Sequence, residues 1–123
     1  MMTKFLLQIY GDDSPEVQAS ATPEQQQQIM DAYTAFTESI KADGSFLAGE
    51  ALLPSATAKV VRVTEGGETV VTDGPFAETK EQLGGYYLVE APDADAASKI
   101  AARIPGSRFG AIEVREVMEF PES

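Results

Sequence analysis

The side chains of this chain that can do chemistry are carboxylates, lysines and tyrosines, because the sequence contains neither histidine nor cysteine. Without cysteine, disulfides, thiol nucleophiles and thiolate metal sites cannot form. Without histidine, the chain lacks the most common general base and transition-metal ligand, and a Ser-His-Asp triad is excluded. We therefore expect no metal site and no cofactor, and any catalysis must use carboxylates, lysine or tyrosine.

Glu50 is the first candidate for acid–base chemistry. Alternation along a predicted strand, expected to be central, places it on the same face as Phe46 and Leu52. A carboxylate on an apolar face loses hydration and its pKa rises, which suits proton transfer. The alternative is structural: Glu50 pairs with Arg62 or Arg115 and satisfies the interior of the fold. Both interpretations stay open.

The tetrapeptide Asp73-Gly74-Pro75-Phe76 is the second candidate. Gly74 can take a positive φ and Pro75 restricts the backbone, so the sequence predicts a rigid bend. Asp73 has two interpretations. Its carboxylate either accepts hydrogen bonds from the amides of the turn, or it projects into a cleft of which Phe76 is the apolar wall.

Glu78 and Lys80 follow this bend at once. Lys80 either forms weak surface ion pairs with neighbouring carboxylates, or it anchors an anion or takes part in catalysis. The candidate catalytic residues are Glu50, Asp73 and Lys80. The candidate ligand-binding residues are Tyr10, Glu50, Asp73, Gly74, Pro75, Phe76, Glu78 and Lys80. We expect Glu50 or Asp73 to line a cleft within reach of Lys80, Arg62 or Arg115.

Hydrophobic periodicity predicts the elements that position these residues. The predicted strands are 4–10, 46–53, 57–64, 69–72, 84–91 and 111–120. The first helix begins at the N-cap Thr22 and ends near Gly44, and its apolar stripe is Ile29, Tyr33, Phe36 and Ile40. The second helix follows the N-cap Asp93. Residues 11–21 are expected to form a polar loop. In the last strand Glu116 interrupts an apolar face, which predicts either a bulge or a wet space.

This order of elements predicts one α+β domain over residues 1–123, a ferredoxin-like split βαβ arrangement with an inserted β-hairpin. Two helices cover one face of an antiparallel sheet, yet the strands are apolar on both faces. An uncovered apolar face is typical of an interface. We therefore expect a homodimer in which two copies pack sheet to sheet about a two-fold axis.

The stretch from Thr72 to Leu88, with the Asp73–Phe76 tetrapeptide at its start, resembles the DGPF branch of the YCII-related family. Residues 7–11, 49–54 and 112–115 resemble other strands of that family, so the likeness covers essentially the whole chain. The resemblance implies a dimeric α+β barrel with a cleft. Some YCII relatives carry a His-Asp pair, which cannot be carried over to a chain without histidine. Other relatives are joined to, or encoded beside, extracytoplasmic-function sigma factors, which implies a regulatory role for some of them.

The acidic composition excludes several partners. The formal net charge is −11, with nine basic and 20 acidic residues. Such a surface repels nucleic acid and anionic membranes. No apolar run approaches the ~20 residues of a membrane helix, and we expect the protein in the cytoplasm.

Two functions are consistent with the sequence. The first is a small-molecule-binding protein, in which any catalysis is cofactor-independent acid–base or lyase-like chemistry. The second is a non-catalytic regulatory or interaction module. A deep pocket with converging polar groups favours the first, and an exposed apolar ridge without a pocket favours the second.

Overall fold

The computed structural model describes residues 2–121 of the 123-residue chain. Its elements are β1 (Thr3–Gly11), α1 (Pro15–Ser20), α2 (Pro23–Ala42), β2 (Phe46–Ala51), η1 (Ser55–Thr57), β3 (Lys59–Val63), β4 (Thr69–Asp73), β5 (Gln82–Ala91), α3 (Ala94–Ala102), η2 (Pro105–Arg108) and β6 (Ala111–Glu116). The predicted α+β class with antiparallel sheets is confirmed, and the arrangement is compatible with the ferredoxin-like fold.

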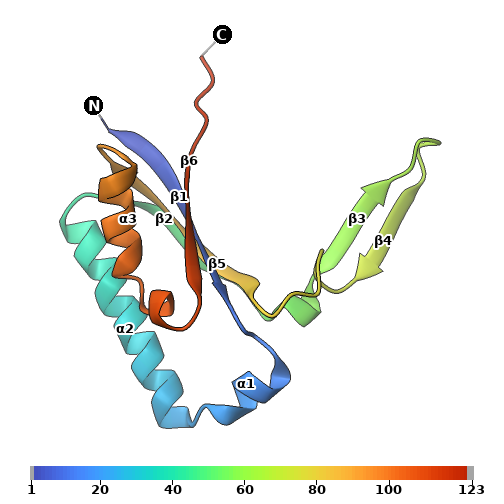
Figure 1. Ribbon diagram of the computed structural model, residues 1–123, viewed down its shortest axis with the longest axis horizontal. Coiled ribbons are helices and arrows are strands. Elements are labelled where there is room, and N and C mark those ends of the chain that lie inside the picture. The colour runs from blue at the N-terminus through green and yellow to red at the C-terminus, as the bar shows by residue number, and fades with distance from the viewer. Residues whose placement is uncertain (1, 122–123) are drawn as a thin grey trace.

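The main sheet has four antiparallel strands in the order β2-β5-β1-β6. Strands β1 and β2, joined through α2, are separated by β5. Strands β5 and β6, joined through α3, are separated by β1. Helices α2 and α3 lie on the same face of this sheet (Figure 1). The two crossovers therefore form the predicted split βαβ pattern.

The core lies between the sheet and the two helices. Phe5 and Leu7 of β1 alternate onto this face, and Val89 of β5 pairs beside Phe5. Ile40 of α2 and Ile104 after α3 close the core from above. Burying each of these side chains contributes roughly 1.5–3 kcal/mol, so this layer is the main source of stability.

Helix α2 begins and ends where the sequence predicts. Thr22 and Gln25 form a reciprocal capping box, with Oγ1 accepting from the Gln25 amide at 3.1 Å and the Thr22 amide donating to Oε1 at 2.9 Å. Gly44 has φ +82°, as expected of a residue that ends a helix. Ile29 is exposed, contrary to its place in the predicted stripe. The first turns of α2 extend past the sheet toward α1 (Figure 1).

Two predicted boundaries are wrong. Residues 11–21 are not all loop, because Ser14 caps the short helix α1 and Pro15 fits its first turn. The last strand ends at Glu116, so neither a bulge nor a wet space within the strand is needed. Met118 and Phe120 lie beyond the sheet and are exposed.

Strand β2 differs from its prediction in place and in register. It is an edge strand, not a central one. Phe46 pairs with Val89 while Ala48 pairs with Leu88, so Leu47 is an extra residue that shifts the alternation. Phe46 therefore faces the helices, and Glu50 lies on the opposite face. The expectation that Glu50 shares a buried face with Phe46 is wrong, and Glu50 is exposed.

The predicted inserted hairpin is present as a separate two-stranded sheet, β3–β4. It projects away from the rest of the molecule (Figure 1), and within residues 2–121 it has no extensive packing against the helices or the main sheet. Val61, Val63 and Val71 share one face and are 61%, 65% and 53% exposed. A lone two-stranded hairpin is only marginally stable in water. Among the described residues, this arm therefore lacks a surface that covers its valines.

Candidate ligand-binding cleft

A cleft of about 850 Å³ opens between α2 and the helix-covered face of the sheet. Strands β1, β2 and β5 contribute its floor, α2 contributes one wall, and loops before α1 and after η2 contribute the mouth. The part used below is lined by Ile9, Tyr33, Thr37, Lys41, Phe46, Gly49, Ala51, Gly85 and Tyr87. Most of this surface is apolar, which is typical of ligand pockets.

Glycines allow the floor of the cleft to pack closely. A methyl group added at Gly49 would lie 2.7 Å from Cδ1 of Tyr87, so the tyrosine ring lies directly over this glycine. A methyl group at Gly85 would lie 2.9 Å from the carbonyl oxygen of Glu50 on the neighbouring strand. Both positions therefore require the absence of a side chain, because a neighbouring ring or carbonyl group occupies the place that a side chain would take.

Three polar side chains of α2 line the opposite wall in one row. Tyr33, Thr37 and Lys41 follow one another at steps of four residues, which places them on one helix face. Tyr33 belongs to the predicted core stripe, and Thr37 and Lys41 are not among the predicted site residues. The signal available in the sequence was this spacing of three hydrogen-bond donors beside the apolar stripe.

The hydroxyl of Tyr33 is held from behind by the backbone. It accepts a hydrogen bond from the amide of Gly106 at 3.1 Å. The phenol is half-buried, and burial raises its pKa above the usual 10.0, so it stays protonated at neutral pH. Among residues 2–121 no acceptor pairs with its proton. Tyr33 therefore presents a free donor to the cleft.

Thr37 and Tyr87 face each other across the cleft. Their hydroxyl oxygens are 2.7 Å apart, so one donates to the other and the second proton is left for another acceptor. The Tyr87 ring packs edge-on against Phe36, with centroids 5.1 Å apart and an interplanar angle of 76°, and against Phe46 at 6.5 Å. Aromatic neighbours on two sides fix this hydroxyl in place.

Lys41 completes the row at the far end of α2. Its ammonium lies 5.0 Å from the centroid of the Phe46 ring, a cation–π contact. In the described part of the chain, the ion pairs join other residues, and no carboxylate lies within ion-pair distance of Lys41. Its charge is therefore not neutralised by a neighbour.

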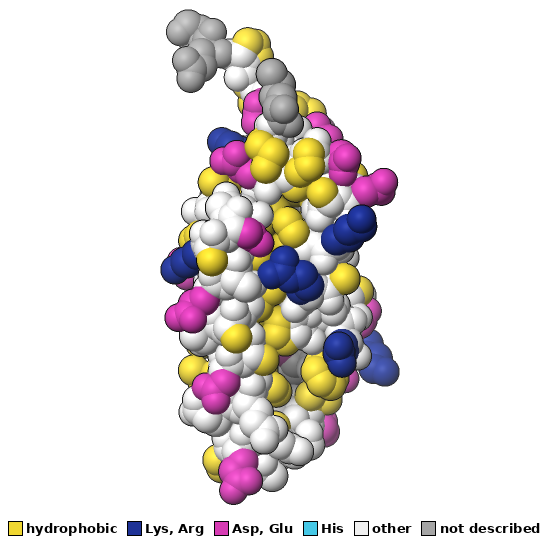
Figure 2. All heavy atoms as spheres, turned by 90° about the vertical axis from the view of Figure 1, so that its left-hand side faces the viewer, with side chains coloured by type: hydrophobic (Ala, Val, Ile, Leu, Met, Phe, Trp, Pro, Cys, Tyr) yellow, Lys and Arg dark blue, Asp and Glu magenta, His cyan; other side chains and the backbone are white. Residues whose placement is uncertain are grey.

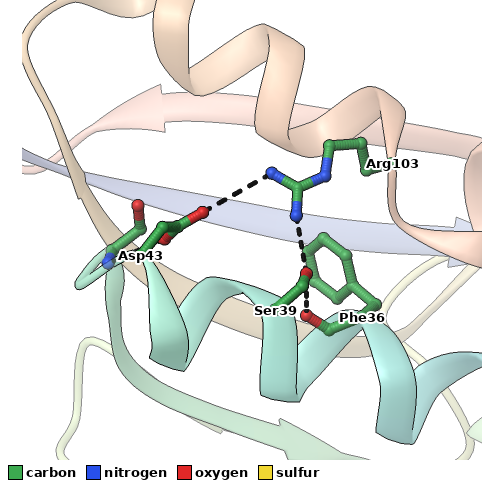
Figure 3. A network of polar contacts seen from close by, with 5 residues as sticks. Phe36, Ser39, Asp43 and Arg103 are labelled. Carbon is green, nitrogen blue, oxygen red and sulfur yellow. Dashed lines mark hydrogen bonds and ion pairs between the residues drawn. The ribbon is translucent and has the colours of Figure 1, made fainter.

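Helix α2 is anchored to α3 by a polar network that Figure 3 shows. The Arg103 guanidinium donates to Ser39 Oγ at 2.6 Å and lies 3.8 Å from the Asp43 carboxylate. Ser39 Oγ in turn donates to the Phe36 carbonyl at 2.7 Å. The network fixes the helix turn that carries Phe36. Because Phe36 packs against the Tyr87 ring, it also helps to fix the Tyr87 hydroxyl in the cleft.

The face that carries α2 and α3 has an apolar seam with several Lys and Arg side chains beside it (Figure 2). Asp and Glu side chains also lie on this face, as expected of a chain with 20 acidic and nine basic residues.

The mouth of the cleft is a pair of hydrogen-bonded loops. Asp13 accepts from the amide and the hydroxyl of Ser55 at 2.7 and 2.8 Å, which ties the loop before α1 to η1. Asp12 accepts from the Ser14 amide at 3.0 Å, and this hydrogen bond holds the pKa of Asp12 below 3.8. Lys80 lines the mouth beside Asp12.

The structure brings only some of the predicted site residues to the cleft. Tyr10, Glu50 and Lys80 are among its lining residues. Pro75 and Glu78 line a neighbouring shallower hollow that also contains Lys80.

The rest of the tetrapeptide lies elsewhere. Asp73 is at the base of the hairpin arm, where its exposed carboxylate pairs with Lys59 Nζ at 2.6 Å. Gly74 has the predicted positive φ, +98°. Phe76 is 77% exposed and lies under the Arg62 guanidinium, 5.2 Å from the ring centroid.

The arginines expected to pair with Glu50 have other neighbours. Arg62 lies over the Phe76 ring, and Arg115 pairs with Glu113 on the same strand. The Glu113 hydrogen bond and charge raise the pKa of Arg115. The proposed structural pairing of Glu50 with either arginine is therefore absent among the described residues.

Over residues 2–121, no group of three or more Asp and Glu side chains is arranged to hold a metal ion. In the same range, no helix combines the length and the apolar character needed to cross a membrane.

Two comparisons with known proteins each cover most of this chain. An uncharacterized protein of Rhizobium meliloti (strain 1021) is 34% identical over 108 residues, which is 86% of this chain and 85% of the relative. The model of the YCII-related domain matches residues 4–121. That match spans all strands of the main sheet and both helices that cover it. The chain therefore belongs to the YCII-related family.

Proposed function

We propose that this protein binds a small organic molecule in the cleft between α2 and the sheet. The observation that carries the proposal is the row of donors on α2, Tyr33, Thr37 and Lys41, facing an apolar floor. Half-buried hydroxyls with uncommitted protons are costly to hold in an apolar wall unless a ligand or water accepts from them. A pocket with a few convergent polar groups is the usual form of a ligand site.

We propose further that any reaction there is proton transfer without a cofactor, of an acid–base or lyase-like kind. The neutral Tyr33 phenol supports the role of a proton donor to a ligand oxygen. The base must then be a carboxylate, and among the lining carboxylates Asp12 at the mouth neither bridges to η1, as Asp13 does, nor points to the opposite face of the sheet, as Glu50 does. The Asp73–Phe76 tetrapeptide supports assignment to the DGPF branch, and the composition supports a cytoplasmic protein.

A competition between matched variants tests binding. Ala51 lies on the cleft floor, so Ala51→Leu fills part of the cavity. Ala32 is exposed on α2 outside the cleft, so Ala32→Leu adds the same bulk without filling it. A thermal-shift screen of small metabolites should give ligands that stabilise the parent and Ala32→Leu but not Ala51→Leu. The proposal fails if no compound stabilises the parent, or if every stabilising compound acts equally on Ala51→Leu.

The second candidate, an interaction module, is favoured by the exposed valine face of the β3–β4 arm. We propose that a second copy covers this arm and the uncovered face of the main sheet, forming a homodimeric barrel. Each copy then supplies both surfaces, as a two-fold interface requires. Sedimentation should give about twice 13.2 kDa for the parent. The variant Val61→Thr/Val71→Thr, which keeps shape but adds hydroxyls, should shift toward monomer. A monomeric parent at micromolar concentration would contradict this arrangement.

A further inference from the structure

Each polar group that α2 turns toward the cleft has a proton available to donate. Tyr33 has one uncommitted hydroxyl proton, the Thr37–Tyr87 pair has another, and Lys41 has an ammonium without a carboxylate partner in the described chain. Such a wall recognises oxygen acceptors, and it disfavours amines because an amine cation would face the like charge of Lys41.

The spacing of the row defines where an anion fits. Four residues of helix rise about 6 Å, so Lys41 stands one turn from Thr37 and two turns from Tyr33. A carboxylate between Lys41 and the Thr37–Tyr87 pair can accept from both the ammonium and the free hydroxyl proton. The Phe46 ring, 5.0 Å beneath Lys41, holds the ammonium on this side of the helix.

The carboxylates that line the cleft do not cancel this preference. Asp13 is committed to the amide and hydroxyl of Ser55. Asp12 accepts from Ser14 at the mouth, where Lys80 lies beside it. Glu50 follows Gly49, whose missing side chain points at the Tyr87 ring, so the Glu50 side chain is directed to the opposite face of the sheet.

The remaining surface between the two ends of the row is apolar. Ile9, Phe46 and Ala51 contribute side chains here, and Gly85 adds none. This surface fits the body of a ligand rather than a second charge.

We infer that the cleft selects an organic carboxylate with an apolar body, the carboxylate bound by Lys41 and the Thr37–Tyr87 hydroxyl pair and a second ligand oxygen bound by Tyr33. This inference rests on the proposed function and names the ligand class of the same site.

Matched fragments test the ligand class. The probes are triplets that share one apolar body and end in a carboxylate, an alcohol or an amine, for example 3-phenylpropionate, 3-phenylpropanol and 3-phenylpropylamine. Dissociation constants come from protein-observed NMR at low ionic strength. Because a charge-assisted hydrogen bond is stronger than a neutral one, the carboxylates should bind roughly tenfold more tightly than the alcohols, and the amines should bind most weakly.

Single lysine variants then locate the anion. Lys41→Gln should lower carboxylate affinity roughly tenfold, to that of the alcohol, while alcohol affinity stays within about twofold. Lys99→Gln, on the exposed face of α3, is the matched control and should change neither. If Lys80→Gln removes the preference and Lys41→Gln does not, the assignment of the anion to Lys41 is wrong.

The outcomes separate this inference from the proposed function. The ligand class is overturned if amines or alcohols bind as well as carboxylates. If Ala51→Leu abolishes that binding, the result still supports the cleft as a binding site. Failure of every probe, or binding that Ala51→Leu leaves unchanged, counts against both.

Discussion

The contact between Gly49 and the ring of Tyr87 makes Gly49→Ala an informative substitution. The added methyl would lie 2.7 Å from Cδ1, 3.0 Å from Cε1 and 3.2 Å from the Tyr86 carbonyl oxygen. Carbon atoms in good contact are about 3.5–4.0 Å apart, so the ring must move by close to 1 Å. Phe36 and Phe46 pack against this ring and Thr37 bonds its hydroxyl, so it cannot move without loss.

The size of the effect follows from two opposing terms. Overpacking of a fixed ring costs about 1–3 kcal/mol. The lower chain entropy of the unfolded alanine variant offsets about 0.4–1 kcal/mol of this cost. We expect a net loss of about 1–2 kcal/mol, which for a domain of this size lowers Tm by roughly 4–8 °C.

Gly11→Ala is the matched control. A methyl group there meets nothing within 4 Å, and the residue does not have a positive φ. This control should gain the entropic term alone and melt roughly 2–4 °C above the parent. Calorimetry and urea titration at one protein concentration measure both variants. If Gly49→Ala had the same Tm as Gly11→Ala, the Tyr87 ring would not lie where the structure places it. In a Tyr87→Leu background the cost of Gly49→Ala should shrink, because the obstructing ring is gone.

Three further perturbations test the cleft and its supports. Burial raises the pKa of Tyr33, so its stabilising contribution is complete below about pH 10 and is lost as the pH rises through the folded pKa. Phenolate absorbance should show a late-titrating tyrosine that Tyr33→Phe removes, and an unchanged titration curve would contradict this assignment. The Ser14 amide lowers the pKa of Asp12, so its contribution is present above about pH 4 and is lost as the pH falls through the folded pKa. Asp12→Asn should therefore flatten the acid side of the curve of unfolding free energy against pH, whereas superimposable curves would argue against the hydrogen bond. Thr22→Ala should cost about 1 kcal/mol in urea unfolding because the capping box is lost. Thr34→Ala, exposed within the same helix, should change stability by less than about 0.5 kcal/mol, and equal effects at the two sites would rule out a special role for the cap.

Local patterns in the sequence predict most of the elements because each depends on neighbouring residues. The cap at Thr22, the turn at Gly44 and the alternation of Phe5 and Leu7 are all read over a few positions. The class and the split βαβ order follow from the succession of these elements.

The position of Glu50 shows where such reading fails. A single extra residue at Leu47 reverses the faces of the strand after it, and nothing in the local pattern marks that bulge. Whether a strand is central or at an edge depends on pairing with β5, more than 30 residues later in the chain.

A cleft was predicted, but its α2 wall was not, for a related reason. The spacing of Tyr33, Thr37 and Lys41 is visible in the sequence, but its meaning depends on which part of α2 extends beyond the apolar contact with the sheet. The Asp73–Phe76 tetrapeptide shows the opposite case. Its bend is predicted correctly from Gly74, while the direction of the Asp73 carboxylate is set by Lys59 on the facing strand of the arm.

The place of β1 in the sheet has a consequence for how the protein is made. Strand β1 is an interior strand of the main sheet, and it leaves the ribosome long before its neighbour β6. Until residue 116 has emerged, one long edge of β1 has unpaired amides and carbonyls, with Phe5 and Leu7 lacking part of their cover. Such edges promote intermolecular pairing. A chain shortened before β6 should therefore accumulate as aggregate rather than as a smaller folded domain, and this domain can complete its folding only after β6 has emerged.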